Sequence, residues 1–449
     1  MAQDPGVHAT EKPSFWALLS PRTLPIFLMF FFWGFGTGGL WLVRPLFAYD
    51  LGDPFLLVAL VSSVSAAPRV LTGPLTGWLA DRFGRKPFII LGAVLHIIAL
   101  TADFFVQDYL AFFLLEILAG TGIAVWMTSA SALLADSTVV TTRGRAVALR
   151  ESSSRIGLLT GPVVAGLIAT LLGLRWVFLF IAVTKVAVVI VTVLLIRESA
   201  RRSARRPRSG QPWWRSDLSM FRTRAFFALA VGTVGLGLVV GGTGVFRTLF
   251  PVQTRVVAGL DATAVGNLIA VAGLAALIAS MPAGLATDRY GRKRLLLASL
   301  VLTAVSVWLM AGTSSFVSAA LAVIVFGIAE AMGTGTIQVY AMDQAPEHMR
   351  GAFLGVWQLF TNIGQISGPL VVGGIADWLG FATAFWIVAL VLVVATVTVA
   401  VFGVETHRRA SPVPAAGPSG AILSPEAGGA DGPRTDAPQA PEEESDVAR

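Results

Sequence analysis

Long apolar segments alternate with short polar ones along most of the chain. An α-helix needs about 20 apolar residues to cross the hydrocarbon core of a bilayer. Twelve segments approach that length, near 24–48, 55–79, 88–106, 109–134, 150–172, 174–196, 226–250, 262–286, 295–313, 316–341, 353–376 and 381–403. The pattern predicts an all-α polytopic membrane protein with twelve transmembrane helices.

The polar segments between these runs differ in charge. Arginine-rich segments follow every second run, from the second to the twelfth, whereas the others carry mainly aspartate. Positively charged loops remain in the cytoplasm. We therefore expect a multi-pass protein of the bacterial cytoplasmic membrane, with both termini in the cytoplasm.

Polar stretches at the ends and in the middle suggest the domain boundaries. Residues 405–449 are rich in Pro, Ala, Gly and Glu and cannot bury enough apolar surface to fold, so we expect a disordered cytoplasmic tail. The other predicted parts are a cytoplasmic segment at 1–23 without a cleavable signal pattern, a six-helix bundle at 24–196, a basic cytoplasmic linker at 197–225 and a second six-helix bundle at 226–404.

Composition excludes several functions. Hydrophobic residues make up 55% of the chain and charged residues 13%, against about 25% charged in soluble proteins. There is no cysteine, the four histidines are scattered, and no phosphate-binding loop or catalytic triad is found. We expect no enzyme activity, metal site or cofactor. Although the net charge is +7, the arginines lie in loops, so we expect no nucleic-acid partner.

The two halves of the sequence repeat each other. GWLADRFGRK at 77–86 returns as GLATDRYGRK at 284–293, an offset of 207 residues. The same offset relates Asp136 to Asp343 and Gly161 to Gly368. Two pseudo-symmetric halves of six helices, in the same orientation, are the arrangement in which transporters place a substrate near the bilayer midplane between the halves.

The repeated decapeptide resembles the signature of the major facilitator superfamily, and the resemblance extends over roughly 20–406, closest to its twelve-helix drug/proton antiporters. It implies that Asp81 caps the eleventh helix across the interface, that Arg85 pairs with Asp136 and that Arg292 pairs with Asp343. Such contacts would hold the outward-facing state and break when the halves rock; alternatively the charges only fix topology. The latch candidates are Gly77, Asp81, Arg85, Asp136, Gly284, Asp288, Arg292 and Asp343, the two glycines allowing neighbouring helices to approach.

A second motif lies in the fifth run. GLLTGPVVAG at 157–166 resembles the family's antiporter motif, with Ala165 in place of a glycine. Small residues pack closely and proline bends a helix, so Gly157, Gly161, Pro162 and Gly166 form a predicted hinge. Because 364–374 in the second half matches equally well, the motif can instead reflect helix packing.

Charged residues inside the runs are functional candidates, because their insertion costs about 2.5–3.5 kcal/mol each. EILAGTG at 116–122 resembles the family's fourth-helix motif, but Glu116 stands where arginine is usual, so the arginine's role does not carry over. Glu116 and Glu330 are candidates for proton coupling. Arg44 lies at a similar depth to Glu116, and a static pair is the alternative. Glu151 and Arg155 share a helix face and predict a local pair.

Helices one, four, seven and ten, with parts of two, five, eight and eleven, line the cavity in this family. On these grounds the candidate substrate contacts are Arg44, Trp126, Arg155, Arg247, Gln338, Trp357, Gln358 and Asn362.

The favoured function is proton-coupled efflux of small amphipathic compounds by a monomer, with protons as the coupling ion and the bilayer as its surroundings. The embedded cations keep proton-coupled uptake of an organic anion or sugar open: Arg44, Arg69, Arg155, Lys185 and Arg247. Export of a lipid or metabolite, and a non-transporting membrane receptor, are further alternatives.

Overall fold

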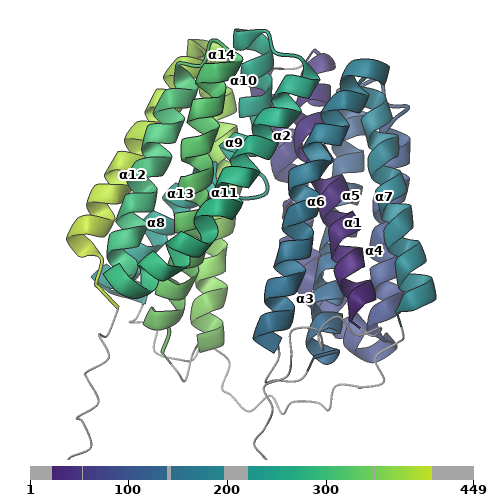
Figure 1. Cartoon of the computed structure of the whole chain (residues 1–449), viewed down its shortest axis with the longest axis horizontal. Coiled ribbons are helices and arrows are strands. Elements are labelled where there is room, and N and C mark those ends of the chain that lie inside the picture. Colours follow the sequence, from purple (N-terminus) through teal and green to yellow (C-terminus); the bar gives the residue numbers. More distant parts are fainter. Residues whose placement is uncertain (1–22, 53, 139–142, 197–220, 347–349, 407–449) are drawn as a thin grey trace, which may run out of the picture. The chain divides into compact units, whose positions relative to one another are not determined.

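The computed structural model describes residues 23–52, 54–138, 143–196, 221–346 and 350–406. Within these ranges it consists of α-helices and connecting turns, without a β-strand (Figure 1). The predicted N-terminal segment, the linker and the tail lie almost entirely outside the described residues, so the predicted domain boundaries stay predictions.

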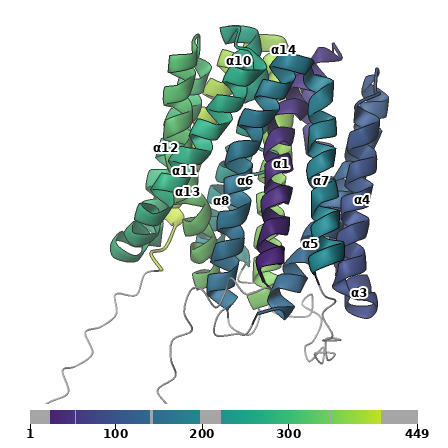
Figure 2. The ribbon, with the colours of Figure 1, turned by 45° about the vertical axis from the view of Figure 1, so that its right-hand side comes forward.

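The described residues of the first half form seven helices. They are α1 (Leu24–Asp50), α2 (Phe55–Val64), α3 (Ala67–Phe83), α4 (Arg85–Asp103), α5 (Tyr109–Asp136), α6 (Arg143–Leu172) and α7 (Leu174–Leu195). The helix α1 packs against both α6 and α7, and it lies between them in Figure 2.

The second half contains the other described helices. They are α8 (Arg224–Val239), α9 (Val245–Thr248), α10 (Phe250–Ala258), α11 (Ala262–Tyr290), α12 (Arg292–Ala311), α13 (Phe316–Gln344) and α14 (Arg350–Phe402). The helix α14 packs against α8 much as α6 packs against α1.

Among the described residues, nine helices are long and apolar enough to cross a membrane, namely α1, α4–α7 and α11–α14. The helix α14 is two helices joined at Gly380, whose φ is 80°. The expected single helices at 55–79 and 226–250 are wrong: the first breaks at Ser65–Ala66, and the second breaks into α8, α9 and α10 around Gly241, whose φ is 112°. These pieces are compatible with twelve spans, and that number stays a prediction.

Glycines end equivalent helices in the two halves. Gly84 and Gly291 have φ of 101° and 95°, and Gly173 and Gly380 have φ of 102° and 80°. A positive φ is readily adopted only by glycine. The repeat is therefore visible in the backbone as well as in the sequence. At the other helix ends, Asp108 and Asp261 accept hydrogen bonds from the first turns of α5 and α11, which explains the aspartates of the arginine-poor segments.

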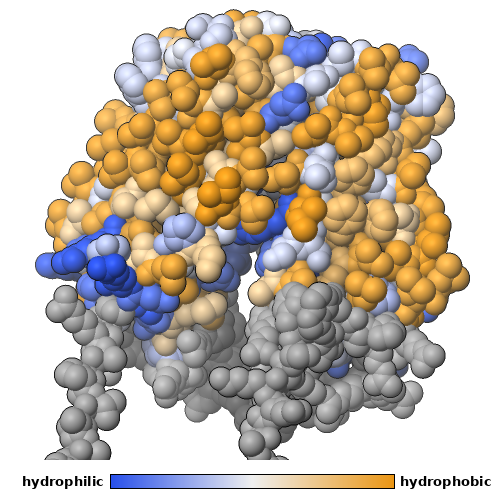
Figure 3. Space-filling view, in the orientation of Figure 1, coloured by the Kyte–Doolittle hydropathy of each residue, from blue (hydrophilic) through white to orange (hydrophobic). Residues whose placement is uncertain are grey.

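On the face shown in Figure 3, the surface is largely apolar along the helices of both halves. Large side chains such as Leu194, Met281 and Trp378 are more than 70% exposed. A soluble monomer rarely leaves so wide an apolar surface in water. This surface is suited to contact with lipid tails.

The two halves meet at the end of the helices that lies away from the arginine-rich segments. A Cβ on Gly166 of α6 would lie 2.7 Å from the carbonyl oxygen of Ala262 at the start of α11. At the equivalent place, a Cβ on Gly373 of α14 would lie 2.6 Å from the carbonyl oxygen of Phe55 at the start of α2. The same pair of contacts, repeated at an offset of 207 residues, closes this end.

Candidate functional site

Three neighbouring cavities lie along the inner faces of the halves. The aromatic pocket, of about 300 Å³, is bounded almost entirely by the first half, with Gly242 from the second. The paired-charge pocket, of about 170 Å³, lies between α1, α6, α9, α11 and α13. The vestibule, of about 670 Å³, is lined by α6, α11 and α13 toward the arginine-rich ends. Glu151 lines all three cavities. Figure 3 shows a hollow with hydrophilic residues between the halves.

Three tryptophans shape the aromatic pocket. The rings of Trp33 and Trp126 stack with centroids 3.7 Å apart and planes 1° apart. The Nζ of Lys185 lies 4.2 Å from the Trp33 ring centroid and donates a hydrogen bond of 2.8 Å to the Trp33 carbonyl oxygen. Trp41 lines the side nearer the second half. The pocket therefore offers flat apolar surface, which suits an amphipathic ligand.

A buried ion pair lies at one wall of this pocket. The Arg44 guanidinium of α1 lies 2.8 Å from the Glu116 carboxylate of α5, and their side chains are 7% and 0% exposed. Arg44 lines the pocket, and Glu116 lies behind it. The partner expected for Glu116 is thus present. A buried charge without its partner is strongly unfavourable, so each side chain constrains the protonation and position of the other.

A second ion pair connects the halves through an aromatic ring. Arg247 of α9 lies 2.8 Å from Glu330 of α13. Its guanidinium lies 4.0 Å from the ring centroid of Trp41 on α1 and donates to the carbonyl of Gly241. Arg247 and Glu330 both line the paired-charge pocket. A cation over an aromatic face is attracted to it, so Glu330 is coupled through Arg247 to the opposite half.

The expected pair of Glu151 and Arg155 is wrong. Glu151 instead pairs with the adjacent Arg150, which also lies over the Phe30 ring. Arg155 lines both the paired-charge pocket and the vestibule. Sequence spacing put both side chains on one face, but Arg150 offers a nearer cation to the same carboxylate.

The other candidate contacts divide by location. Gln338 lines the vestibule. Trp357, Gln358 and Asn362 line none of the three cavities. The indole nitrogen of Trp357 donates a hydrogen bond of 2.9 Å to Thr233, so that side chain fastens α14 to α8. The side chain of Arg69 lies outside the described part of the chain.

The expected pairs around the repeated decapeptide are present. Arg85 lies 3.1 Å from Asp136 and 2.7 Å from Asp81, and Arg292 lies 3.2 Å from Asp343. They are formed although a 670 Å³ vestibule separates the halves at this end. Each pair lies within one half and so does not join the halves directly, and the expectation that these contacts break when the halves rock stays a prediction.

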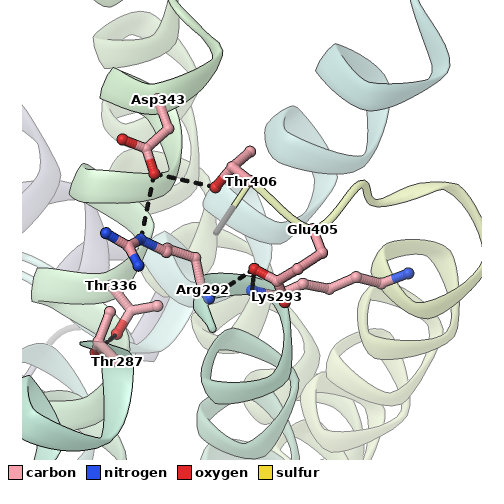
Figure 4. A network of polar contacts seen from close by, with 7 residues as sticks. All are labelled: Thr287, Arg292, Lys293, Thr336, Asp343, Glu405 and Thr406. Atoms are coloured by element: carbon pink, nitrogen blue, oxygen red, sulfur yellow. Dashed lines mark hydrogen bonds and ion pairs between the residues drawn. The ribbon is translucent and has the colours of Figure 1, made fainter. Parts of the chain in front are cut away.

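Figure 4 shows the second copy of this network. The Glu405 carboxylate accepts a hydrogen bond of 2.9 Å from the Arg292 backbone amide at the start of α12, and Thr406 donates one of 3.0 Å to Asp343. The segment after α14 is thereby held against α12 and α13. This copy of the motif stabilises its own half.

The helix-approach role expected for two motif glycines is wrong for this conformation. A Cβ on Gly284 would meet no atom within 4 Å, and one on Gly77 would only touch Thr128 at 4.0 Å. Gly284 and Asp288 line the vestibule instead. The residues just before α14, which Asp81 is expected to cap, lie partly outside the described residues, so that contact stays a prediction.

The glycines of the predicted hinge are contact points. A Cβ on Gly157 or Gly161 would lie 2.4 or 2.0 Å from carbonyl oxygens of α1, those of Phe31 and Phe35. The carbonyl oxygen of Pro162 would lie 2.3 Å from a Cβ on Gly266 of α11. One side of α6 thus packs tightly within its half and its far end packs against the other half. This geometry suits both a pivot and simple close packing.

Two buried polar residues were missed from the sequence. Asp103, in the last turn of α4, and His96, two turns earlier, are both 0% exposed. Asp103 stands at the edge of an apolar run and looks like a loop aspartate, and His96 is a lone histidine. The one sign of Asp103 in the sequence was its place at the end of an apolar run, at about the predicted depth of Arg44 and Glu116.

The chain resembles known proteins in sequence. The family model described as Major Facilitator Superfamily matches residues 26–257 and 234–435. The chain is 26% identical over 336 residues to "Multidrug resistance protein MdtG" of Rahnella sp. (strain Y9602), covering 74% of this chain and 80% of the relative. It is 25% identical over 363 residues to "Multi-drug resistance efflux pump PmrA" of Streptococcus pneumoniae serotype 4, covering 77% and 87%.

Solved structures show the same fold. A bacterial homolog to the human lysosomal transporter Spinster, in an inward-facing and occupied conformation, gives a TM-score of 0.70 at 15% identity, covering 84% of this chain and 95% of that one. A D-xylose-proton symporter gives 0.69 at 16% identity, covering 86% and 98%. At such identities the likeness concerns the fold.

Proposed function

Since this chain belongs to the Major Facilitator Superfamily and is a multi-pass membrane transporter, we propose that it exports small amphipathic compounds in exchange for protons. The observation that carries the proposal is the aromatic pocket with the Arg44–Glu116 pair at its wall. Apolar aromatic surface suits the substrate, and a buried acid beside a cation suits a proton. The printed names of the similar proteins MdtG and PmrA, both multidrug transporters, support the same direction.

The positions of the closed and open ends support alternating access. The halves touch at Gly166 and Ala262, and the vestibule lies at the opposite end, near the arginine-rich segments. If those segments are cytoplasmic, by the positive-inside rule, this is an inward-facing state. Substrate would enter the aromatic pocket from the cytoplasm, and the bacterial cytoplasmic membrane, cytoplasmic termini and a monomeric protein belong to the same proposal.

Two acids are candidates for the coupling proton. Glu116 is fully buried against Arg44, and Glu330 lies against Arg247 in a pocket shared by both halves. Burial disfavours a charged carboxylate and a neighbouring cation favours it. A movement that changes either distance therefore changes proton affinity. Proton binding from outside would weaken the ion pair while substrate leaves.

The test is energised efflux of a lipophilic cationic dye from cells that make the protein. We expect efflux by the wild type to stop on adding a protonophore, and Glu116→Gln or Glu330→Gln to reduce it to that level. Asp108→Asn, a change at an exposed helix cap, is the matched control and should leave efflux intact. Protonophore-insensitive efflux by the wild type would contradict proton coupling.

A proton-coupled uptake symporter for an organic anion is the second candidate. The observation that favours it is the set of cations at the cavities, Arg44, Arg150, Arg155 and Arg247. Proteoliposomes with an imposed pH gradient separate the two modes. Symport accumulates an organic anion on the alkaline side, whereas antiport accumulates the dye on the acidic side.

A further inference from the structure

We propose that Asp103 and Glu116 together hold one proton beside Arg44, as a two-carboxylate proton site inside the first half. Asp103 is the member that sequence patterns and the proposed function leave out. It comes from α4, Glu116 from α5 and Arg44 from α1, so three helices meet at the site. The role of this site in coupling rests on the proposed exchange of substrate for protons. The binding of a proton at the site does not depend on that proposal.

The burial of Asp103 carries the first step. Asp103 is 0% exposed. Neither of its carboxyl oxygens makes a hydrogen bond within the part of the chain that the structure describes. Its helix α4 packs along α5, the helix that carries Glu116, and the charges of Glu116 and Arg44 act on its carboxyl group. A buried carboxylate with neither a hydrogen bond nor its own cation is strongly disfavoured.

Charge counting gives the second step. Arg44 provides one positive charge, and its guanidinium lies 2.8 Å from Glu116. Two ionised acids beside one cation would leave a net negative charge in an apolar interior. Binding one proton makes the cluster neutral, with one carboxylate against Arg44 and one neutral carboxyl group. The arrangement resembles other paired acids, in which close carboxylates do not both ionise.

The other charged groups around the site have their own contacts. Lys185 of α7 is held at the Trp33 carbonyl and ring. Arg175 of α7 donates to the Phe104 carbonyl, next to Asp103, and lies over the Phe47 ring. His96 of α4 interacts electrostatically with Lys185 and Arg44, and neither ring nitrogen makes a hydrogen bond within the described residues. Among the described residues, neither Lys185 nor Arg175 forms an ion pair with Asp103 or Glu116.

The position of the site gives it a direction. Asp103 ends α4 at the closed end of the molecule, next to the short turn before α5, whereas Arg44 lines the aromatic pocket. A proton from water at the closed end is taken up at Asp103 and leaves to the water of the pocket through Glu116. This path stays within the first half. It therefore differs from the route between the halves that a substrate takes.

Infrared difference spectroscopy of the purified full-length protein in lipid tests the proton without any substrate. At neutral pH we expect a protonated-carboxyl band in the wild type. Asp103→Asn and Glu116→Gln should each remove it, because one acid then faces one cation. Asp108→Asn is the matched control and should keep it. A wild type without the band overturns the proposal, as does a band that survives Glu116→Gln, which would leave the proton on Asp103 alone.

A transport measurement then tests the role in coupling. In proteoliposomes, Asp103→Asn should lose dye accumulation driven by a pH gradient while keeping dye exchange without a gradient. Equal loss of both would mean that Asp103 serves only folding and overturns the coupling role. If the wild type moves no dye but the infrared bands behave as expected, the proton site stands and the proposed export fails.

Discussion

Gly161 illustrates how much a single residue decides about helix packing. A Cβ at this position would lie 2.0 Å from the Phe35 carbonyl oxygen, closer than two non-bonded heavy atoms can approach, so α1 and α6 meet here only because the side chain is missing. The equivalent Gly368 would meet the Leu238 carbonyl oxygen at 2.4 Å. The equivalent glycine thus lies between the equivalent pair of helices in each half, with its contact shifted by one turn, and this favours packing as the motif's basic role.

Gly161→Ala should therefore destabilise the protein, by about 1–3 kcal/mol, because the extra methyl forces α1 and α6 apart. Gly355→Ala is the control: a Cβ there would meet nothing within 4 Å, and alanine is the better helix former by up to about 1 kcal/mol. Thermal unfolding of the two variants in one detergent gives the comparison. An equal midpoint for both would contradict the close contact.

The starts of α2 and α11 are the elements that hold the closed end together. The Asp377 carboxylate of α14 accepts hydrogen bonds of 2.7 and 3.0 Å from the Phe55 and Leu56 amides at the start of α2. At the equivalent position, Thr170 of α6 accepts one of 3.2 Å from the Thr263 amide at the start of α11. Each half therefore caps a helix of the other, and a charged acceptor stabilises a helix start better than a neutral one.

Asp377→Ala removes the charged cap and should weaken the closed end by about 1 kcal/mol, a few-fold in population. The expected result is faster labelling, by an impermeant thiol reagent from outside, of a cysteine introduced at Thr37 in the aromatic pocket. Because the chain has no native cysteine, the signal is unambiguous. Trp378→Ala, at the neighbouring side chain that is 88% exposed, is the control and should leave the rate unchanged.

At the scale of the whole molecule, the proposed alternating access requires the closed end to open and the vestibule to close. The hydroxyls of Thr170 and Thr263 lie 2.8 Å apart across the two halves. A covalent link between these positions should hold the halves together at this end. The alternating-access proposal therefore makes a prediction that depends on no particular substrate contact.

A Thr170→Cys/Thr263→Cys variant joined by a short thiol crosslinker should lose dye efflux to background. A third cysteine at Gln338, in the vestibule, should still react with a reagent applied from the cytoplasmic side. Each single-cysteine variant treated with the crosslinker is the control and should keep transporting. Undiminished efflux by the crosslinked protein would rule out rocking about this contact.

The sequence by itself determined the class of protein, because helices in contact with lipid need long runs of apolar residues. It also determined the internal symmetry, because the motifs of the two halves recur at a constant offset. The similar predicted depth of Arg44 and Glu116 indicated that they could pair, and the family resemblance implied an ion pair between Arg85 and Asp136. Both pairs are present.

Only the tertiary structure decided which helix faces meet and which end is closed. It buried Asp103 without a hydrogen bond from the described residues, paired Glu151 with Arg150 and placed the Trp357 indole against Thr233. It also showed that each ion pair of the repeated decapeptide lies within one half and is present while the vestibule is open. The physical reason is that an apolar pattern reports depth and local periodicity, whereas contacts between helices depend on how each is rotated against its neighbours and on which conformation the halves adopt.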